Sequence, residues 1–117
     1  FVRFFPFFNV LVATGKREEA HKVINTKLEG ATGKTKSFLY YQRSLLATGE
    51  EEIFADLRAS LTANPRNKDA LYRFYRIYYN KKDWRRAQYY LKQVVAIDPR
   101  NSEYLAKNAE LDELLKR

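Results

Sequence analysis

The 117-residue chain has no cysteine, no methionine, one histidine and one tryptophan. The absence of cysteine excludes disulfide bonds, zinc sites with thiolate ligands and cysteine nucleophiles. The histidine, His21, stands away from the helical face that Val23 and Ile24 share, so we expect it to be solvated. The spacing holds no pair of acids together in an apolar setting, as general acid–base chemistry would need. We therefore predict a non-enzyme without a metal, a cofactor or a small-molecule substrate.

A long apolar run is missing too. The stretch from Phe1 to Val12 is shorter than the about 20 residues that span a membrane, and Arg3 and Pro6 interrupt it. We do not expect it to insert into a membrane; we expect a buried helix that starts near Pro6, because proline is tolerated in a first helical turn. Its phenylalanines would pack on an upstream helix or mediate self-association. Since the chain begins with Phe1, we interpret it as a piece of a longer protein.

Two short sequences recur at one spacing. Pro65-Arg66-Asn67 returns as Pro99-Arg100-Asn101, and Ala13-Thr14-Gly15 returns as Ala47-Thr48-Gly49, each 34 residues later. Both mark turns, since each follows an apolar run and precedes a charged, helix-forming stretch. A shared period of this length is typical of helix–turn–helix repeat arrays.

Apolar spacing predicts an all-α fold with no strand. Asp83 is the expected N-cap of the sixth of seven helices. Their ranges are about 6–13, 17–28, 36–47, 50–63, 68–80, 84 to Pro99, and 102–116. Short connections between them force successive helices into antiparallel pairs. The expected core residues are Ala20, Val23, Ile24, Leu28, Phe38, Tyr41, Leu45, Phe54, Leu57, Leu61, Leu71, Phe74, Tyr75, Tyr78, Trp84, Ala87, Leu91, Val94, Val95, Leu105, Ala109, Leu111 and Leu115.

The segment from Lys68 to Asn101 resembles a tetratricopeptide repeat. The residues that carry the resemblance are Leu71, Phe74, Tyr78, Trp84, Ala87, Leu91 and Asp98-Pro99. Ala87 stands where the family places a small residue at the close crossing of paired helices. The segment from Lys34 to Asn67 fits less well, with Ile53 or Phe54 at that place, and residues 1–30 lack the closing proline.

The resemblance implies a right-handed superhelical α-solenoid of about three antiparallel helix pairs and a capping helix. Its repeat units would be residues 1–33, 34–67 and 68–101, with the cap at 102–117, all in a single domain over 1–117. Tyr75 and Gln42 stand where the family prefers a small residue, so we expect wider crossings there.

Gly30-Ala31-Thr32-Gly33-Lys34-Thr35 resembles the end of a phosphate-binding loop. The full pattern needs a glycine at the position of Leu28, and no apolar strand precedes it. We interpret this segment as a turn between helices.

The net charge of +8 is concentrated in one segment. Residues 68–92 hold eight basic and two acidic side chains. For Arg85, Arg86 and Lys92 the simpler interpretation is a solvated outer face on the sixth helix. Arg73 and Arg76 differ, because they stand on the helix that the resemblance assigns to a binding groove.

In the tetratricopeptide family, the first helix of each pair lines a concave groove. The resemblance implies these groove residues: Leu39, Tyr40, Arg43, Leu46, Tyr72, Arg73, Arg76, Tyr79 and Asn80. Stacked repeats would place Leu39 near Tyr72, Arg43 near Arg76 and Leu46 near Tyr79. Since neither arginine is assigned to the core, replacing both by glutamate should leave stability unchanged.

Tyrosines and arginines dominate binding hot spots, and arginine captures carboxylates with two hydrogen bonds. We therefore predict a protein-binding scaffold that holds an acidic and apolar peptide or protein segment. The carboxylate clamp of chaperone-binding family members is absent, because Leu39, Arg43, Tyr72 and Arg76 occupy the aligned positions. The alternative is a basic helical-repeat module that binds single-stranded nucleic acid, since cations interleaved with tyrosines can contact phosphates and stack on bases.

Overall fold

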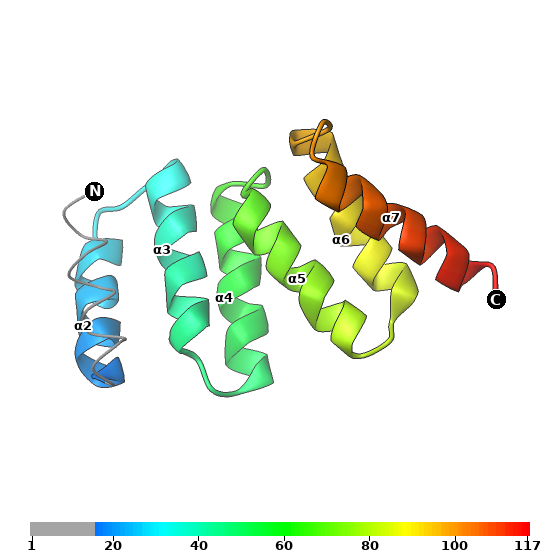
Figure 1. The fold of residues 1–117 in the computed structure, drawn as a ribbon. Helices are drawn as coiled ribbons and strands as arrows, with labels where there is room; N and C mark the ends of the chain where they lie inside the picture. The colour runs from blue at the N-terminus through cyan, green and yellow to red at the C-terminus, as the bar shows by residue number, and fades with distance from the viewer. Residues whose placement is uncertain (1–15) are drawn as a thin grey trace. The chain divides into compact units, whose positions relative to one another are not determined.

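The computed structural model describes residues 16–117, which form six α-helices and no strand. The helices are α2 Arg17–Leu28, α3 Gly33–Leu46, α4 Glu50–Ala63, α5 Lys68–Asn80, α6 Trp84–Ile97 and α7 Ser102–Leu115 (Figure 1). The all-α prediction is confirmed for this part of the chain, although α3 begins three residues earlier than predicted. The predicted helix at 6–13, the Phe1–Val12 stretch and the first Ala-Thr-Gly copy lie outside the described residues.

Side-chain caps fix the starts of three helices. Asn67 Oδ1 accepts a hydrogen bond of 3.2 Å from the Ala70 backbone N–H, and Asn101 Oδ1 accepts one of 3.0 Å from that of Glu103. Asp83 Oδ1 accepts from the Arg86 N–H at 3.2 Å, which confirms the predicted cap. Capping by asparagine or aspartate satisfies backbone N–H groups that have no partner in the first turn. The repeated Pro-Arg-Asn therefore ends one helix and starts the next.

Packing divides the chain into two compact units, which we describe separately. Unit 1 ends at Pro65; unit 2 is Arg66–Arg117. In unit 1, α3 packs against both α2 and α4, and in unit 2, α6 packs against both α5 and α7. Figure 1 shows the short turns that reverse the chain between α3 and α4 and between α5 and α6.

In unit 1, Ala20 and Ile24 of α2 pack with Leu39 and Leu46 of α3. The predicted face of α2 is confirmed, because Val23 and Leu28 pack on the same cluster. The predicted face of α3 is wrong in part, since Leu45 is 41% exposed and its neighbour Leu46 is buried. A helix that packs on two sides buries two faces, and a single apolar stripe does not describe it.

The contact between α3 and α4 is polar at its centre. Ser37 Oγ donates to the Ser60 carbonyl at 2.7 Å, and Ser60 Oγ donates to the Ser37 carbonyl at 2.7 Å. Both serines are fully buried, and Leu57 is buried as predicted. Small hydroxyl side chains thus allow the two helices to approach while each hydroxyl keeps a partner.

Unit 2 has a more apolar interior. Seven predicted core residues are buried in it: Leu71, Phe74, Tyr75, Ala87, Leu91, Val94 and Leu111. Ala87 has no exposed surface, in agreement with the small residue expected at the crossing of α5 and α6. The core prediction is therefore confirmed for these positions.

The last helix, α7, packs on α6 through one leucine and a polar contact. Leu111 is fully buried, and the Gln88 amide donates to Asp112 Oδ1 at 2.6 Å. Leu105 and Leu115 are 45% and 37% exposed and Ala109 is exposed as well, so the predicted apolar face of this helix is wrong at these three positions. The spacing of the leucines along α7 did not show which of them would be buried.

Candidate functional site

Unit 2 contains a pocket of about 230 Å³ between α5 and α7, which we call the α5–α7 pocket. Its lining residues are Tyr72, Tyr75, Arg76, Tyr79, Asn80, Lys107 and Glu110. The α5 members recur three and four residues apart and so share one helical face. Four of the predicted groove residues, Tyr72, Arg76, Tyr79 and Asn80, are brought together here.

Aromatic rings form the apolar part of the α5–α7 pocket. The ring centroids of Tyr72 and Tyr75 are 5.3 Å apart, and those of Tyr75 and Tyr79 are 5.7 Å apart. The series continues from Tyr72 to Tyr104 at 5.3 Å and from Tyr79 to Trp84 at 5.2 Å. Tilted and edge-on contacts at these distances are favourable, so each ring is held by its neighbours. The pocket therefore has a preformed aromatic wall.

A hydrogen bond closes one side of the pocket. The Tyr79 hydroxyl donates to Glu110 Oε2 at 2.7 Å, which ties α5 to α7. This bond to a carboxylate raises the pKa of the Tyr79 phenol above its ordinary value of 10.0. Burial raises the pKa of the Tyr75 phenol to about 12, with a further contribution from Tyr72. Both phenols are thus neutral hydrogen-bonding groups across the physiological range.

Two cations and one acid line the α5–α7 pocket. The Arg76 side chain is exposed and makes no ion pair within residues 16–117. Lys107 Nζ lies 3.8 Å from Glu103 Oε1, and such a long and partly exposed ion pair contributes little to stability. Glu110 is engaged by Tyr79. A guanidinium beside tyrosine rings can bind a carboxylate while the rings contact an apolar group.

Sequence reasoning missed three members of this pocket. Tyr75 was assigned only to the core, although it is both buried and in the pocket wall. Lys107 and Glu110 were missed because the last helix was interpreted as a cap without a binding role. Their spacing of three residues places them on one face of α7, and this was the available signal. Arg73 is partly buried and does not line the pocket.

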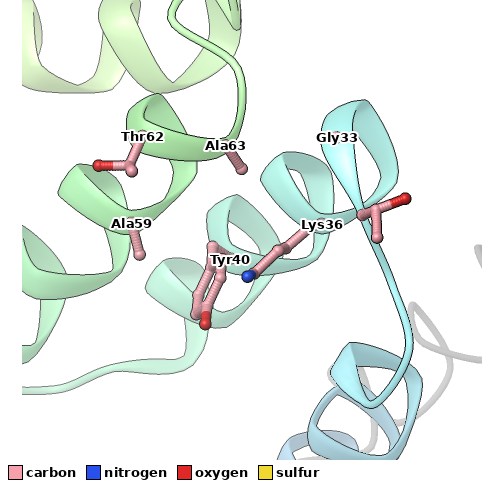
Figure 2. Close-up of a pocket in the computed structure, with 7 residues that line it drawn as sticks. Gly33, Lys36, Tyr40, Ala59, Thr62 and Ala63 are labelled. Atoms are coloured by element: carbon pink, nitrogen blue, oxygen red, sulfur yellow. The ribbon is translucent and has the colours of Figure 1, made fainter.

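Unit 1 holds a second pocket, of about 520 Å³, between α3 and α4. Figure 2 shows the side chain of Lys36 pointing toward Tyr40 on α3, with Ala59, Thr62 and Ala63 on α4 as further lining residues of this pocket. Tyr40 is the only predicted groove residue among the lining residues of this pocket. Its remaining lining residues are Thr32 and Gly33, so the charge it offers comes from Lys36 alone.

Arg43 is part of the internal structure of unit 1. Its Nη2 lies 2.7 Å from Asp56 Oδ1, its Nε donates to the same oxygen at 2.9 Å, and Nη1 donates to Asn25 at 3.1 Å. The guanidinium also lies 5.0 Å from the centre of the Tyr40 ring. The Asp56 side chain is only 9% exposed, so it depends on this partner. The expectation that an Arg43→Glu change would leave stability unchanged is therefore corrected.

Leu39 and Leu46 are 2% and 4% exposed and belong to the core of unit 1. The assignment of Leu39 to a groove surface is corrected, because it is buried in this core. Leu46 is also in the core but lines another pocket of about 520 Å³ with Arg17, His21 and Thr48, so its groove role stays a prediction. The expected neighbours Leu39 with Tyr72, Arg43 with Arg76 and Leu46 with Tyr79 belong to different units, and these pairings stay predictions.

The segment that resembles a phosphate-binding loop forms the turn before α3. Gly30 and Gly33 adopt the left-handed region, with φ of 79° and 56°, and α3 begins at Gly33. Such angles favour glycine and explain the two glycines as turn residues. Helix α2 precedes this turn, not the apolar strand of a nucleotide-binding loop.

Residues 16–117 contain no group of three or more histidine, cysteine or acidic side chains that could hold a metal ion. None of the helices in this range is long and apolar enough to cross a membrane. No protein-family model matches the sequence, and no curated protein matches it either. The resemblance to tetratricopeptide repeats thus stays a prediction from the residues.

Proposed function

We propose that this protein is a tetratricopeptide-like scaffold that binds an acidic and apolar peptide segment in the α5–α7 pocket. The observation that carries the proposal is the exposed guanidinium of Arg76 beside the preformed wall of Tyr72, Tyr75 and Tyr79. Aromatic and arginine side chains in a concave site are the groups that contribute most to protein recognition. The role is one of binding without catalysis.

The charged residues of the α5–α7 pocket favour one orientation of a bound peptide. Arg76 and Lys107 attract a carboxylate, whereas Glu110, held by Tyr79, repels one. A bound segment would place an acidic side chain at Arg76 and an apolar side chain against Tyr72. Asn80 can hydrogen-bond to the peptide backbone through its amide, which supplies both a donor and an acceptor.

The proposal extends to the architecture. Adjacent helices pack in each unit, and Asn67 and Asn101 cap helices at the proposed repeat starts. Both observations support a superhelical stack of repeats in which α5 and α7 are successive groove helices. Within that stack, α7 would contribute Lys107 and Glu110 to the groove besides covering the apolar end of the last complete repeat.

A peptide array tests this function. The probes are short peptides in which aspartate or glutamate alternates with leucine or phenylalanine, with matched peptides that carry asparagine and glutamine in place of the acids. We expect the acidic set to bind and Arg76→Glu to weaken binding about tenfold or more, since hot-spot changes cost about 2 kcal/mol. Tyr72→Ala should weaken it as well.

Arg100→Glu is the matched control, because it makes the same charge change at an exposed position of unit 2 outside the pocket. If Arg100→Glu weakens binding as much as Arg76→Glu does, the attraction is one of general charge and the assigned site is wrong. Equal binding of the acidic and the amide peptides would contradict the proposed ligand chemistry.

A further inference from the structure

A second surface of unit 2 lies on the outer side of α6 and shares no residue with the α5–α7 pocket. Arg85, Tyr89 and Lys92 recur four and three residues apart and are all exposed, so they form one stripe of the helix. Tyr89 is 65% exposed, more than any other large apolar side chain in the described part of the chain. With Arg86, which neighbours this stripe on α6, and Lys82 in the turn before the helix, we call these five exposed residues the α6 basic face.

Stacked aromatic rings of α5 and α6 lie next to the α6 basic face. Phe74 stacks on Tyr90 at 4.5 Å, and Tyr90 is nearly parallel to Tyr78 at 5.8 Å. The Arg86 guanidinium lies 5.7 Å from the centre of the Tyr78 ring. An ordered stack thus runs from the buried Phe74 to an exposed arginine at the surface.

Two side chains of the face are held in place by these rings and by an acid. Tyr89 meets Tyr90 edge to face, with centroids 5.0 Å apart at 86°. The Asp83 carboxylate accepts from Arg86 Nη1 at 2.9 Å and so holds the guanidinium over Tyr78. The Tyr89 ring and the Arg86 guanidinium are therefore two positioned flat groups that face solvent.

Local helix interactions account for Arg86, which is paired with Asp83, but not for Arg85. Arg85 and Arg86 occupy the first turn of α6, which contains no acidic residue, although the positive end of the helix dipole disfavours cations. Lys82 adopts φ of 60°, a region where glycine would be less strained. Residues 81–92 hold five basic side chains and one acid. Arg85 therefore stands where the helix dipole disfavours a cation, and it makes no ion pair with the residues that the structure describes.

We propose that the α6 basic face binds single-stranded nucleic acid. Bases would stack on the Tyr89 ring and on the Arg86 guanidinium, while Lys82, Arg85 and Lys92 contact phosphates. Positioned rings among cations are what proteins use to bind unpaired strands without sequence preference. A protein partner would need more apolar surface, and Tyr89 is the only exposed large apolar side chain on α6.

Fluorescence anisotropy with a labelled oligothymidine of about 15 nucleotides tests this site on the full chain. We expect binding at low salt that weakens as salt rises from about 50 to 200 mM. The Arg85→Ala, Lys92→Ala double variant should reduce the slope of log affinity against log salt by about 1.4, since two phosphate contacts are lost. Tyr89→Ala should weaken binding about fivefold or more, whereas Tyr89→Phe keeps the ring and the affinity.

Two control variants separate this surface from the rest of unit 2. Lys116→Ala removes an exposed cation just after α7 and should leave oligonucleotide affinity unchanged. Arg76→Ala should also leave it unchanged, because Arg76 belongs to the α5–α7 pocket. A loss with Arg76→Ala would place the oligonucleotide in that pocket and overturn the assignment. The peptide proposal is then tested separately by the peptide array.

Other results would overturn the proposal outright. Absence of oligonucleotide binding at low salt is one. Binding that Tyr89→Ala does not weaken is another, because the attraction would then be general charge. Competition by poly-glutamate or by vesicles with anionic lipid is the third test. If either displaces the labelled oligonucleotide as well as unlabelled oligonucleotide does, and Tyr89→Ala does not change this, the face binds an acidic protein or a membrane surface instead. Far-UV circular dichroism of each variant confirms that the helices are retained.

Discussion

Units 1 and 2 are both small helical stacks, yet their interiors differ. Five buried polar residues of the described chain lie in unit 1: Ser37, Gln42, Ser44, Asp56 and Ser60. Unit 2 has one, Gln88, and fills its interior with aliphatic and aromatic side chains. Unit 1 therefore adds buried hydrogen bonds and an ion pair to its apolar core, and such polar contacts are sensitive to the loss of one partner. Unit 2 is stabilised mainly by apolar burial, which leaves its polar side chains at the surface.

Arg43 of α3 and Arg76 of α5 illustrate this difference. Arg43 is partly buried and bound to Asp56 and Asn25 of unit 1, whereas Arg76 is exposed beside a tyrosine wall. Both helices carry tyrosines near the arginine. The difference between the two arginines comes from Asp56 on α4, which occupies the hydrogen-bond donors of the Arg43 guanidinium.

The largest expected effect comes from the cores. Leu57→Ala in unit 1 and Leu91→Ala in unit 2 each remove a fully buried side chain and should lower the free energy of unfolding by about 2–5 kcal/mol. Urea unfolding can be followed by far-UV circular dichroism and by the fluorescence of Trp84, the single tryptophan, which lies in unit 2. Stacked repeats stabilise their neighbours, so Leu57→Ala should also lower the Trp84 midpoint. An unchanged midpoint would contradict the proposed stack.

The next effect sharpens the contrast between the arginines. Arg43→Glu should lower the free energy of unfolding by about 3 kcal/mol, because Asp56 loses its partner and gains a like charge. Arg76→Glu should change it by less than about 0.5 kcal/mol. Adding Asp56→Asn to Arg43→Glu should recover part of the loss, since it removes the repulsion. Chemical denaturation measures all three, and a mild effect of Arg43→Glu would show that the ion pair is not structural.

The smallest expected effect is a loss of stability of unit 2, and it occurs only at alkaline pH. Tyr75 has a pKa of about 12 in the folded protein against 10.0 ordinarily, and the pKa of Tyr79 is also raised. A raised pKa means that folding favours the neutral phenol, so its contribution is complete below pH 10 and is lost as the pH rises toward 12.

Denaturation at several pH values, read by Trp84 fluorescence, measures this loss. Tyr75→Phe should flatten the decline above pH 10 and leave stability at pH 7 almost unchanged. A decline as steep as in the unchanged protein would assign the alkaline sensitivity to other groups. Absorbance titration of the phenols provides an independent measurement of the same pKa values.

Local signals predicted most of the fold. The ranges 17–28, 50–63 and 68–80 were predicted as they occur, because apolar periodicity and turn residues mark them clearly. The cap at Asp83 was predicted, whereas the repeated Pro-Arg-Asn was predicted only as a turn and its asparagines prove to be caps as well. Four of the predicted groove residues meet in one pocket, since they lie on one face of one helix.

The errors arose where an assignment required a partner helix. Leu45 and Leu46 are adjacent and equally apolar, and α2 covers only the second. The sequence did not distinguish Arg43 from Arg76, because the ion pair of Arg43 is made with Asp56 on another helix, α4. Lys107 and Glu110 joined the pocket because α7 brings them to the tyrosines of α5.

The sequence by itself determined the helices, their caps and the aromatic and basic character of residues 68–92, because these follow from properties of single residues and from spacing along one helix. Only the tertiary structure decided which arginine is internal and which is exposed, which leucines are covered, and which acid meets Tyr79. These outcomes depend on which faces of different helices come together, and no spacing within one helix encodes that.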